Sequence, residues 1–291
     1  MRPGSAITAD LLRVAARSRR LLNRAARARI AAFLRARALP DGGYRGRGAA
    51  ADVYYTLFGL LAGAALRAPP DRRRHRAWLD AIDPADLDLP HLAAWVASQR
   101  LLRLFGLPRP MRRRAAAALA AYRSPDGAFS LDPGGPGSAY GLYLAVIAGE
   151  GLGRAAPAIA PASAAALLDA ALADPSAGLS PLAAATLALQ ALGGAPPVPA
   201  VLSALSACRR PDGGFAAHRD ASASDLLSTA VGALTQRRLG APLRAGEASA
   251  AGQFVQSLWD DSGGFRGAVA DALPDCEYTA YALLALGALE P

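Results

Sequence analysis

Two carboxyl groups, those of Asp275 and Glu277, lie two residues apart near the C-terminus. Two close carboxyls that share one proton titrate in two steps, and the raised pKa of one of them suits a general acid. A structural role competes with this interpretation. Asp275 precedes an apolar helical pattern, so it can cap that helix, and the helix dipole then stabilises ionised Glu277. The sequence leaves both hypotheses open.

Aromatic side chains on strongly apolar segments form a second group of candidates. Their faces attract cations, although packing between helices is an equally ordinary use of such residues. These aromatics are Tyr54, Tyr55, Trp95, Tyr140, Tyr143 and Tyr278.

Cationic side chains that follow glycine-containing turns form a third group: Arg45, Arg47, His218 and Arg266. Arginine binds phosphate with bidentate geometry, yet a chain this rich in arginine also exposes many arginines to solvent. His91, at the start of another apolar segment, is a further polar candidate.

The elements that position these groups come from an internal repeat. Pro-Asp-Gly-Gly-Tyr at 40–44 recurs in altered form at 125–129, 211–215 and 261–265. Glycine suits the positive φ of such a turn, and the aromatic residue after it can wedge between helices. About ten residues later an apolar helical pattern begins, with a capping residue at Asp52, Ser138, Asp225 or Asp275.

The spacing predicts six helical hairpins. Asp41 and Asp126 are 85 positions apart, which leaves room for two hairpins of roughly 43 residues each. The second helix of each hairpin is apolar almost all round, so neighbours must surround it, and an inner and an outer layer of helices follow. We therefore expect an all-α protein in which 21–291 form a single domain. Residues 1–20 form a separate basic amphipathic helix, solvated on the outside or resting on an anionic membrane.

Composition excludes several classes of function. The formal charge is +9, but every cation is arginine and no aromatic-interleaved basic stripe occurs, so we expect no nucleic-acid partner. The two cysteines, Cys208 and Cys276, suggest neither a disulfide framework nor a cysteine-rich metal site. The sequence shows neither a signal peptide nor a run long enough to span a membrane. A cytoplasmic protein is the default expectation.

The repeat of helix, Asp-Gly-Gly-aromatic turn and Asp-x-x-Tyr-Thr helix resembles that of protein prenyltransferase β subunits and of squalene-hopene and oxidosqualene cyclases. The resemblance covers residues 21–289. It implies an α/α toroid, an α6/α6 barrel of six hairpins, whose inner helix starts face a central cavity that holds an isoprenoid. It also implies that Asp52 and the aromatic candidates line that cavity.

The resemblance does not extend to the zinc site of protein prenyltransferases. The aspartate ligand matches Asp225, but Leu227 and Tyr278 occupy the cysteine and histidine positions, and zinc sites of this type need thiolate and imidazole. A replacement site from Cys276 and His218 is a minor alternative. We expect no metal and no cofactor, and Asp225 becomes a candidate catalytic carboxylate.

The triterpene cyclase motif Asp-x-Asp-Asp-Thr aligns with 275–279. Glu277 takes the place of the proton donor, Asp275 that of its partner, and Tyr278 replaces the last acid. The leading hypothesis is a bacterial cyclase-like enzyme for an isoprenoid. One alternative is a prenyltransferase or diphosphate-handling enzyme that uses Arg45, Arg47, His218 and Arg266, because turn cations bind diphosphate in prenyltransferases. The other alternative is a toroid that binds a lipid or protein without catalysis. The oligomeric state is not predicted.

Overall fold

The computed structural model describes residues 6–68, 70–103, 106–174 and 176–291, and these are mostly helical. A short helix, α1 (Ile7–Arg17), precedes six consecutive helix pairs. These pairs are α2 (Arg24–Arg37) with α3 (Val53–Ala65), α4 (Arg72–Asp80) with α5 (Leu89–Leu102), α6 (Arg109–Ala120) with α7 (Ala139–Leu152), α8 (Pro161–Ala173) with α9 (Leu179–Ala191), α10 (Val198–Ala207) with α11 (Leu226–Arg238), and α12 (Ala245–Ser257) with α13 (Cys276–Leu289). The described residues thus confirm an all-α protein.

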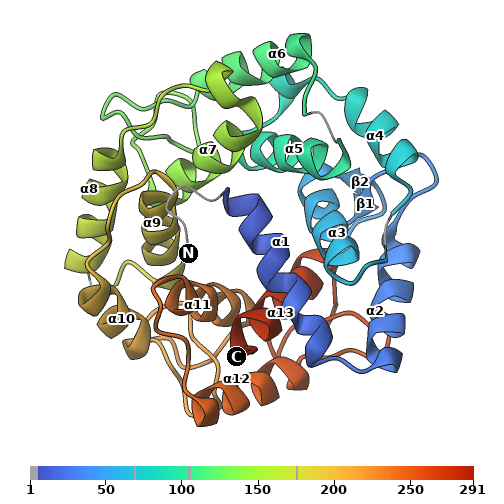
Figure 1. Ribbon diagram of the computed structural model, residues 1–291, viewed down its shortest axis with the longest axis vertical. Coiled ribbons are helices and arrows are strands. Elements are labelled where there is room, and N and C mark those ends of the chain that lie inside the picture. The colour runs from blue at the N-terminus through green and yellow to red at the C-terminus, as the bar shows by residue number, and fades with distance from the viewer. Residues whose placement is uncertain (1–5, 69, 104–105, 175) are drawn as a thin grey trace.

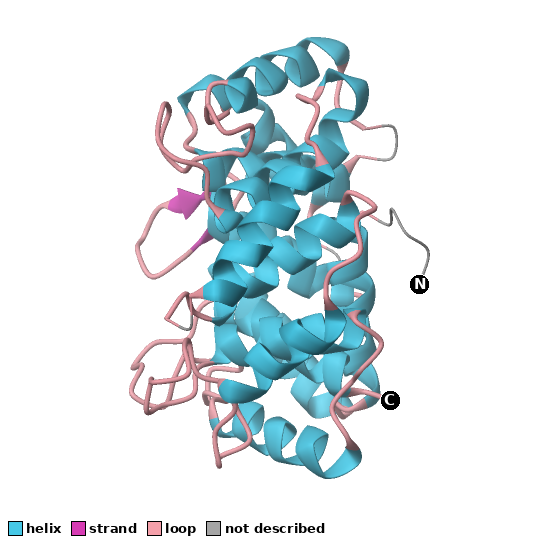
Figure 2. Cartoon of the chain, turned by 90° about the vertical axis from the view of Figure 1, so that its left-hand side faces the viewer, coloured by secondary structure: helices cyan, strands magenta, loops and turns pink. Residues whose placement is uncertain are grey.

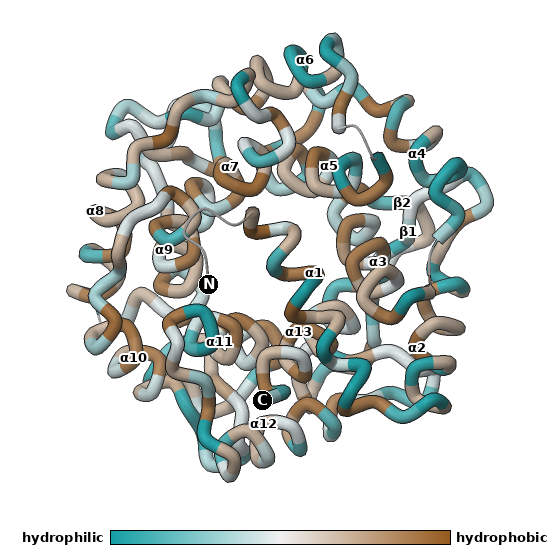
Figure 3. The backbone as a smooth tube through the Cα atoms, in the orientation of Figure 1, coloured by the Kyte–Doolittle hydropathy of each residue, from teal (hydrophilic) through white to brown (hydrophobic). Residues whose placement is uncertain are grey.

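The second helices of the pairs lie inside and the first helices outside (Figure 1). The inner helices contact one another in a closed cycle, in which α3, α5, α7, α9, α11 and α13 follow in order and α13 contacts α3 again. Figure 3 shows hydrophobic stretches along the inner helices and hydrophilic stretches on outer helices such as α6. The apolar pattern and the layer agree because an inner helix has neighbours on several sides.

Side-chain caps start five of the inner helices. Asp52, Asp88, Ser138, Asp225 and Asp275 each accept a hydrogen bond from the backbone N–H three residues later, at 2.7–3.0 Å. The four caps predicted from the repeat are confirmed. Helix α9 differs, because it begins at Leu179 without a side-chain cap. The Leu179 N–H instead donates to the carbonyl of Ala217 in the next hairpin, at 2.7 Å.

The glycine turns bring successive hairpins together. Gly263, at φ 96°, lies so close to α2 that a Cβ atom would be 2.5 Å from the Arg29 carbonyl oxygen. Gly213 makes the equivalent approach to Ala250 in α12. The last hairpin therefore meets the first through the same kind of contact that joins the fifth hairpin to the sixth.

Threonine fixes the aromatic wedge of three of the turns. Its hydroxyl oxygen accepts the backbone N–H of the wedge, from Phe215 to Thr229 at 3.0 Å and from Phe265 to Thr279 at 3.2 Å. Tyr44 donates to Thr56 in the same way, at 2.8 Å. After the first turn the chain forms a two-stranded antiparallel ribbon of β1 (Tyr44–Arg45) and β2 (Ala51–Asp52). Figure 2 shows this ribbon on the side opposite the C-terminus.

Candidate functional site

An apolar cavity of about 330 Å³ runs between the inner helices. Four tyrosines give it an aromatic wall: Tyr54 of α3, Tyr140 and Tyr143 of α7, and Tyr281 of α13. The remaining wall is formed by alanines, Ser180, Val231 and the leucines Leu11, Leu187, Leu227, Leu234 and Leu284. No charged side chain of the described residues lines it. Such a lining suits an apolar ligand that carries few polar groups.

Helix α1 closes one end of this cavity, which corrects the expectation of a solvated or membrane-bound outer helix. It lies across the middle of the inner helices (Figure 1), and Leu11 reaches the cavity wall. Gly287 makes this possible, because a Cβ atom there would overlap the Val14 carbonyl oxygen. The amphipathic pattern of Ile7–Arg17 reflects one apolar face that packs on α13, α3 and α7.

Ion pairs hold α1 in place. Asp10 pairs with Arg238 of α11, and both side chains are buried. Glu150 of α7 accepts hydrogen bonds from the first N–H groups of α1, including that of Thr8 at 3.2 Å, as a carboxylate at a helix N-terminus should. Arg17 and Arg20 pair with Glu290. These arginines therefore neutralise carboxylates of the same chain.

Glu277 lies behind the cavity wall and contacts it through Tyr54. Its Oε1 atom accepts a hydrogen bond from the Tyr54 hydroxyl at 2.8 Å, and Tyr54 lines the cavity. Tyr281, one helical turn after Glu277, lines it too, so both side chains project from one face of α13. Burial raises the pKa of Glu277 to about 7, the charge of Asp275 adds to the rise, and the Tyr54 hydrogen bond opposes it. Desolvation thus favours the protonated form of Glu277, whereas the dipole of α13 favours the ionised form.

Asp275 has partners other than Glu277. It caps α13, is fully buried, and accepts a hydrogen bond from Nε of Arg47 at 3.0 Å. Burial raises the pKa of Asp275, although the Tyr278 N–H and Arg47 counteract the rise. The two carboxyls thus take separate partners instead of sharing a proton, and Asp275 acts on Glu277 only through its charge.

A carboxylate–imidazole–carboxylate cluster lies near Tyr54. His91 contacts Asp52 through Nε2 at 3.2 Å and Asp88 through Nδ1 at 2.6 Å, and its ring lies 6.3 Å from that of Tyr54. The hydrogen bond to Asp52, opposed by burial and aided by Asp88, raises the pKa of His91 to about 9. Asp52 and Asp88 are caps of α3 and α5, so the inner helix starts bring the cluster together.

Three of the aromatic candidates lie away from the cavity. Trp95 is fully buried and donates its indole N–H to the Leu79 carbonyl at 2.9 Å, so it packs between α5 and α4 and cannot bind substrate. Tyr55 covers the loop residue Gly46, and Tyr278 covers Gly267. The prediction that these three line the cavity was therefore wrong, because it rested on the helix of each residue and not on the side of the helix from which the residue projects. It also missed Tyr281, which the four-residue spacing from Glu277 could have revealed.

The cationic candidates do not form an open phosphate site. Arg47 is engaged by Asp271 and Asp275, and it lies over the Tyr278 ring at 5.6 Å. Arg266 donates to the Ser257 carbonyl at 3.5 Å, and Arg45 is half-buried. His218 is exposed in a loop.

The metal-site alternatives find no support among the described residues, which contain no cluster of three potential ligands. Cys208 and Cys276 are both buried free thiols. Burial raises the pKa of the Cys276 thiol to about 12, which disfavours the thiolate that a metal binds. Asp225 caps α11 and accepts a second hydrogen bond from the Ser228 hydroxyl at 2.7 Å.

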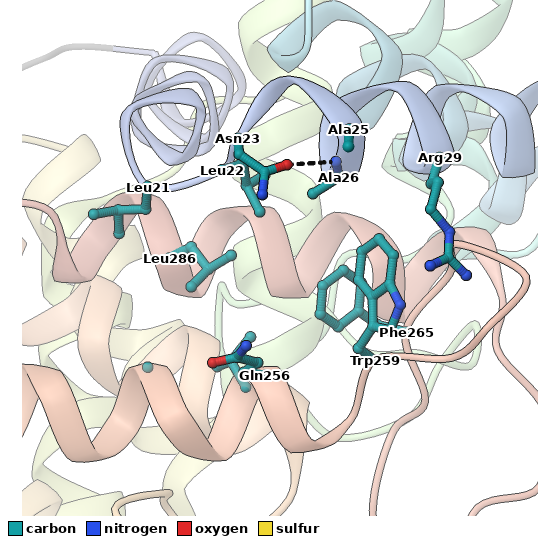
Figure 4. A pocket seen from close by; sticks show the side chains of 12 residues that line it. Leu21, Leu22, Asn23, Ala25, Ala26, Arg29, Gln256, Trp259, Phe265 and Leu286 are labelled. Carbon is teal, nitrogen blue, oxygen red and sulfur yellow. Dashed lines mark hydrogen bonds between the residues drawn. The ribbon is translucent and has the colours of Figure 1, made fainter.

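A larger pocket of about 550 Å³ lies where the first and last hairpins meet, between α2 and α12 (Figure 4). Its polar groups are Asn23, which caps α2, Arg29, which lies 5.3 Å from the Trp259 ring, and Gln256. These groups offer no acid or base for a reaction, so the smaller central cavity is the better candidate site.

No helix of the described residues has both the length and the apolar character needed to cross a membrane.

Comparison with known proteins leaves the family open. The chain matches no known protein family and no curated protein. The function is therefore inferred from the geometry of the site and from the resemblance of the repeat to that of prenyltransferases and triterpene cyclases.

Proposed function

We propose that the chain is an α/α toroid of the terpenoid cyclase and prenyltransferase superfamily. Three observations support this assignment: the six helix pairs, the closed cycle of contacts between inner helices, and the approach of Gly263 to α2. The caps Asp52 and Asp275 at the inner helix starts also support it, because the resemblance implies such helix starts.

Within this fold we propose a cyclase-like reaction on an isoprenoid, with Glu277 as the acid. The observation that carries the proposal is a half-buried carboxyl with a pKa near 7, hydrogen-bonded to a tyrosine of an apolar, tyrosine-lined cavity. A carboxyl with this pKa is partly protonated at neutral pH, whereas an ordinary glutamate is almost fully ionised. General acids are tuned in this way.

The residues of the site account for each step of such a reaction. Glu277 transfers its proton to one carbon of a double bond, and the other carbon becomes a cation. A second double bond attacks the cation, and a new carbon–carbon bond forms. The tyrosine faces stabilise the cation, and the apolar wall excludes water that would trap it. The Glu277 carboxylate takes a proton back from the cyclic cation, which restores a double bond, so the net change is an isomerisation.

Product analysis of Glu277→Gln tests the proposal. The protein is incubated with farnesol, farnesyl diphosphate, geranylgeranyl diphosphate and squalene, and extracts are analysed by gas chromatography and mass spectrometry, after phosphatase treatment where needed. We expect product from the parent protein and at least a 100-fold lower rate from the variant, because glutamine cannot donate a carboxylic proton. Asp86→Asn, which alters an exposed carboxyl outside the cavity, is the control. Equal rates in parent and Glu277→Gln would exclude Glu277 as the acid.

A second candidate function is ligand binding without catalysis. It is favoured by the structural role of the aspartates, since Asp52, Asp225 and Asp275 are all accounted for as helix caps. The same incubation separates the two candidates, because a binding protein returns its ligand unchanged. The engagement of Arg47 by two carboxylates gives the diphosphate-handling alternative less support.

A further inference from the structure

We infer that the central cavity takes an uncharged chain of about 10–15 carbon atoms and discriminates against the corresponding diphosphate and against a chain of 30 carbons, on the basis of the volume of the cavity and the charges around it. This inference deepens the proposed function, on which it rests, because it specifies the ligand of the same cavity.

The volume sets the length of the chain. A cavity of about 330 Å³ lies at the lower end of the range for small-molecule sites, about 300–1,000 Å³. Taking about 30 Å³ per liquid-packed heavy atom, the share of a water molecule, the cavity encloses about eleven heavy atoms. A chain of 10–15 carbons fits with one end at the open side, whereas 30 carbons need close to three times that space.

Helix α1 bounds the cavity away from Glu277. Leu11 lines it together with Leu284, which lies about two helical turns after Glu277 on α13, so α1 occupies space that a longer chain would need. Arg238 and Arg100 near α1 are engaged by Asp10 and Glu150. A charged head group would therefore have to compete with carboxylates already bound to these arginines.

The charges at the open end argue against a diphosphate. Glu277, Asp52 and Asp88 bring carboxyls to this end, and His91 is shared between the two aspartates. The nearby Arg47 is likewise shared between Asp271 and Asp275. A diphosphate would add negative charge beside these carboxylates, and like charges repel.

An uncharged chain meets suitable partners instead. Its body contacts leucine, alanine and tyrosine side chains. A single hydroxyl at one end could donate to or accept from the polar groups at the open side, such as the Tyr140 hydroxyl or Ser180. A neutral prenyl alcohol or a short polyene has this chemistry.

Binding of three probes tests the inference. Farnesol, farnesyl diphosphate and squalene are titrated into the full chain, and complexes are measured by isothermal titration calorimetry and native mass spectrometry. We expect farnesol to bind at least tenfold more tightly than farnesyl diphosphate, and squalene to show no saturable binding. Diphosphate or squalene affinity equal to that of farnesol would overturn the inference.

Three variants test where farnesol binds and why the diphosphate binds less tightly. Leu227→Trp fills the cavity and should weaken farnesol binding at least tenfold, whereas Val269→Trp at an exposed position should not. Asp52→Asn, which retains a capping side chain, combined with Glu277→Gln, should raise the affinity for farnesyl diphosphate at least fivefold. Unchanged diphosphate affinity in this double variant would contradict the electrostatic argument.

The outcomes separate the inference from the proposed function. Tight binding and turnover of farnesyl diphosphate or squalene would overturn the inference and leave an isoprenoid enzyme in place. Farnesol binding without product would leave the inference in place and remove the catalytic proposal. Absence of binding by all three probes would overturn both.

Discussion

The carboxyl of Glu277 shows how one residue depends on its surroundings. The sequence alone allowed an ionised helix-terminal carboxylate or a proton donor, since both need a glutamate in the first turn. Burial favours the proton donor, because it raises the pKa of Glu277 to about 7. Asp275, with the same kind of position, is instead bound by Arg47 and a backbone N–H. Chemistry at this scale is set by partners that lie far apart in sequence.

The raised pKa of Glu277 predicts a pH dependence of stability. The folded state holds its proton up to about pH 7, whereas the unfolded chain releases it near pH 4.3. The associated stability is therefore complete below about pH 4.3 and lost as pH rises to 7. Denaturant unfolding measures the free energy of unfolding of the parent protein and of Glu277→Gln at about pH 4.5 and about pH 8. Between these two pH values the parent should lose about 1–3 kcal/mol of stability relative to the variant. A difference independent of pH would contradict a raised pKa.

Cyclisation should depend on the same proton. The acid form of Glu277 decreases above a pKa of about 7, so kcat should fall about tenfold for each pH unit above that value. A pH–rate profile between pH 5 and 9 with the best substrate checks this. A rate that rises through pH 7 would show that Glu277 acts as a base or not at all.

The position of helix α1 depends on contacts with residues far away in the sequence. Arginine-rich amphipathic segments are usually surface helices, and nothing within 1–20 reveals that Asp10 will meet Arg238, 228 residues away. The cap residues, in contrast, could be predicted because a cap and its helix are neighbours in sequence. The same reasoning explains why Trp95 was misplaced: its helix was predictable, but the face on which it lies depends on α4.

The ion pair of α1 predicts a large cost for one substitution. Asp10→Asn leaves the buried guanidinium of Arg238 without its carboxylate, which should lower the free energy of unfolding by about 3–5 kcal/mol. Arg13→Gln removes an exposed partner of the same carboxylate and should cost less than about 1 kcal/mol. Chemical denaturation measures both. Equal small effects would mean that α1 is not docked as described.

The whole molecule depends on closure between the last and first hairpins. The turn spacing predicted six helix pairs, and the pairs are present, yet spacing cannot tell a closed arrangement from an open solenoid. Closure requires a contact between hairpins more than 200 residues apart, which the Gly263 turn makes with Arg29 of α2. The cavity follows from this closure, so its volume could not be predicted from sequence, although three of its four tyrosines, Tyr54, Tyr140 and Tyr143, are among the aromatic candidates.

Gly263→Ala tests this contact. The added methyl would lie 2.5 Å from the Arg29 carbonyl oxygen at a backbone φ of 96°, so we expect a loss of stability of about 2–4 kcal/mol. Gly252→Ala in α12 meets no neighbouring atom and should be neutral or stabilising by up to about 1 kcal/mol. Thermal and denaturant unfolding compare the two. A harmless Gly263→Ala would argue against the closing contact.

The origin of the transferred proton tests the central claim most directly. The protein is incubated with farnesol in deuterium oxide, and the product is examined by mass spectrometry and deuterium nuclear magnetic resonance. If exchangeable Glu277 protonates a double bond in the closed cavity, the product carries deuterium bound to carbon at the site of protonation, and Glu277→Gln yields none of it. A cyclic product free of carbon-bound deuterium, or the same labelled product from Glu277→Gln, would contradict the mechanism.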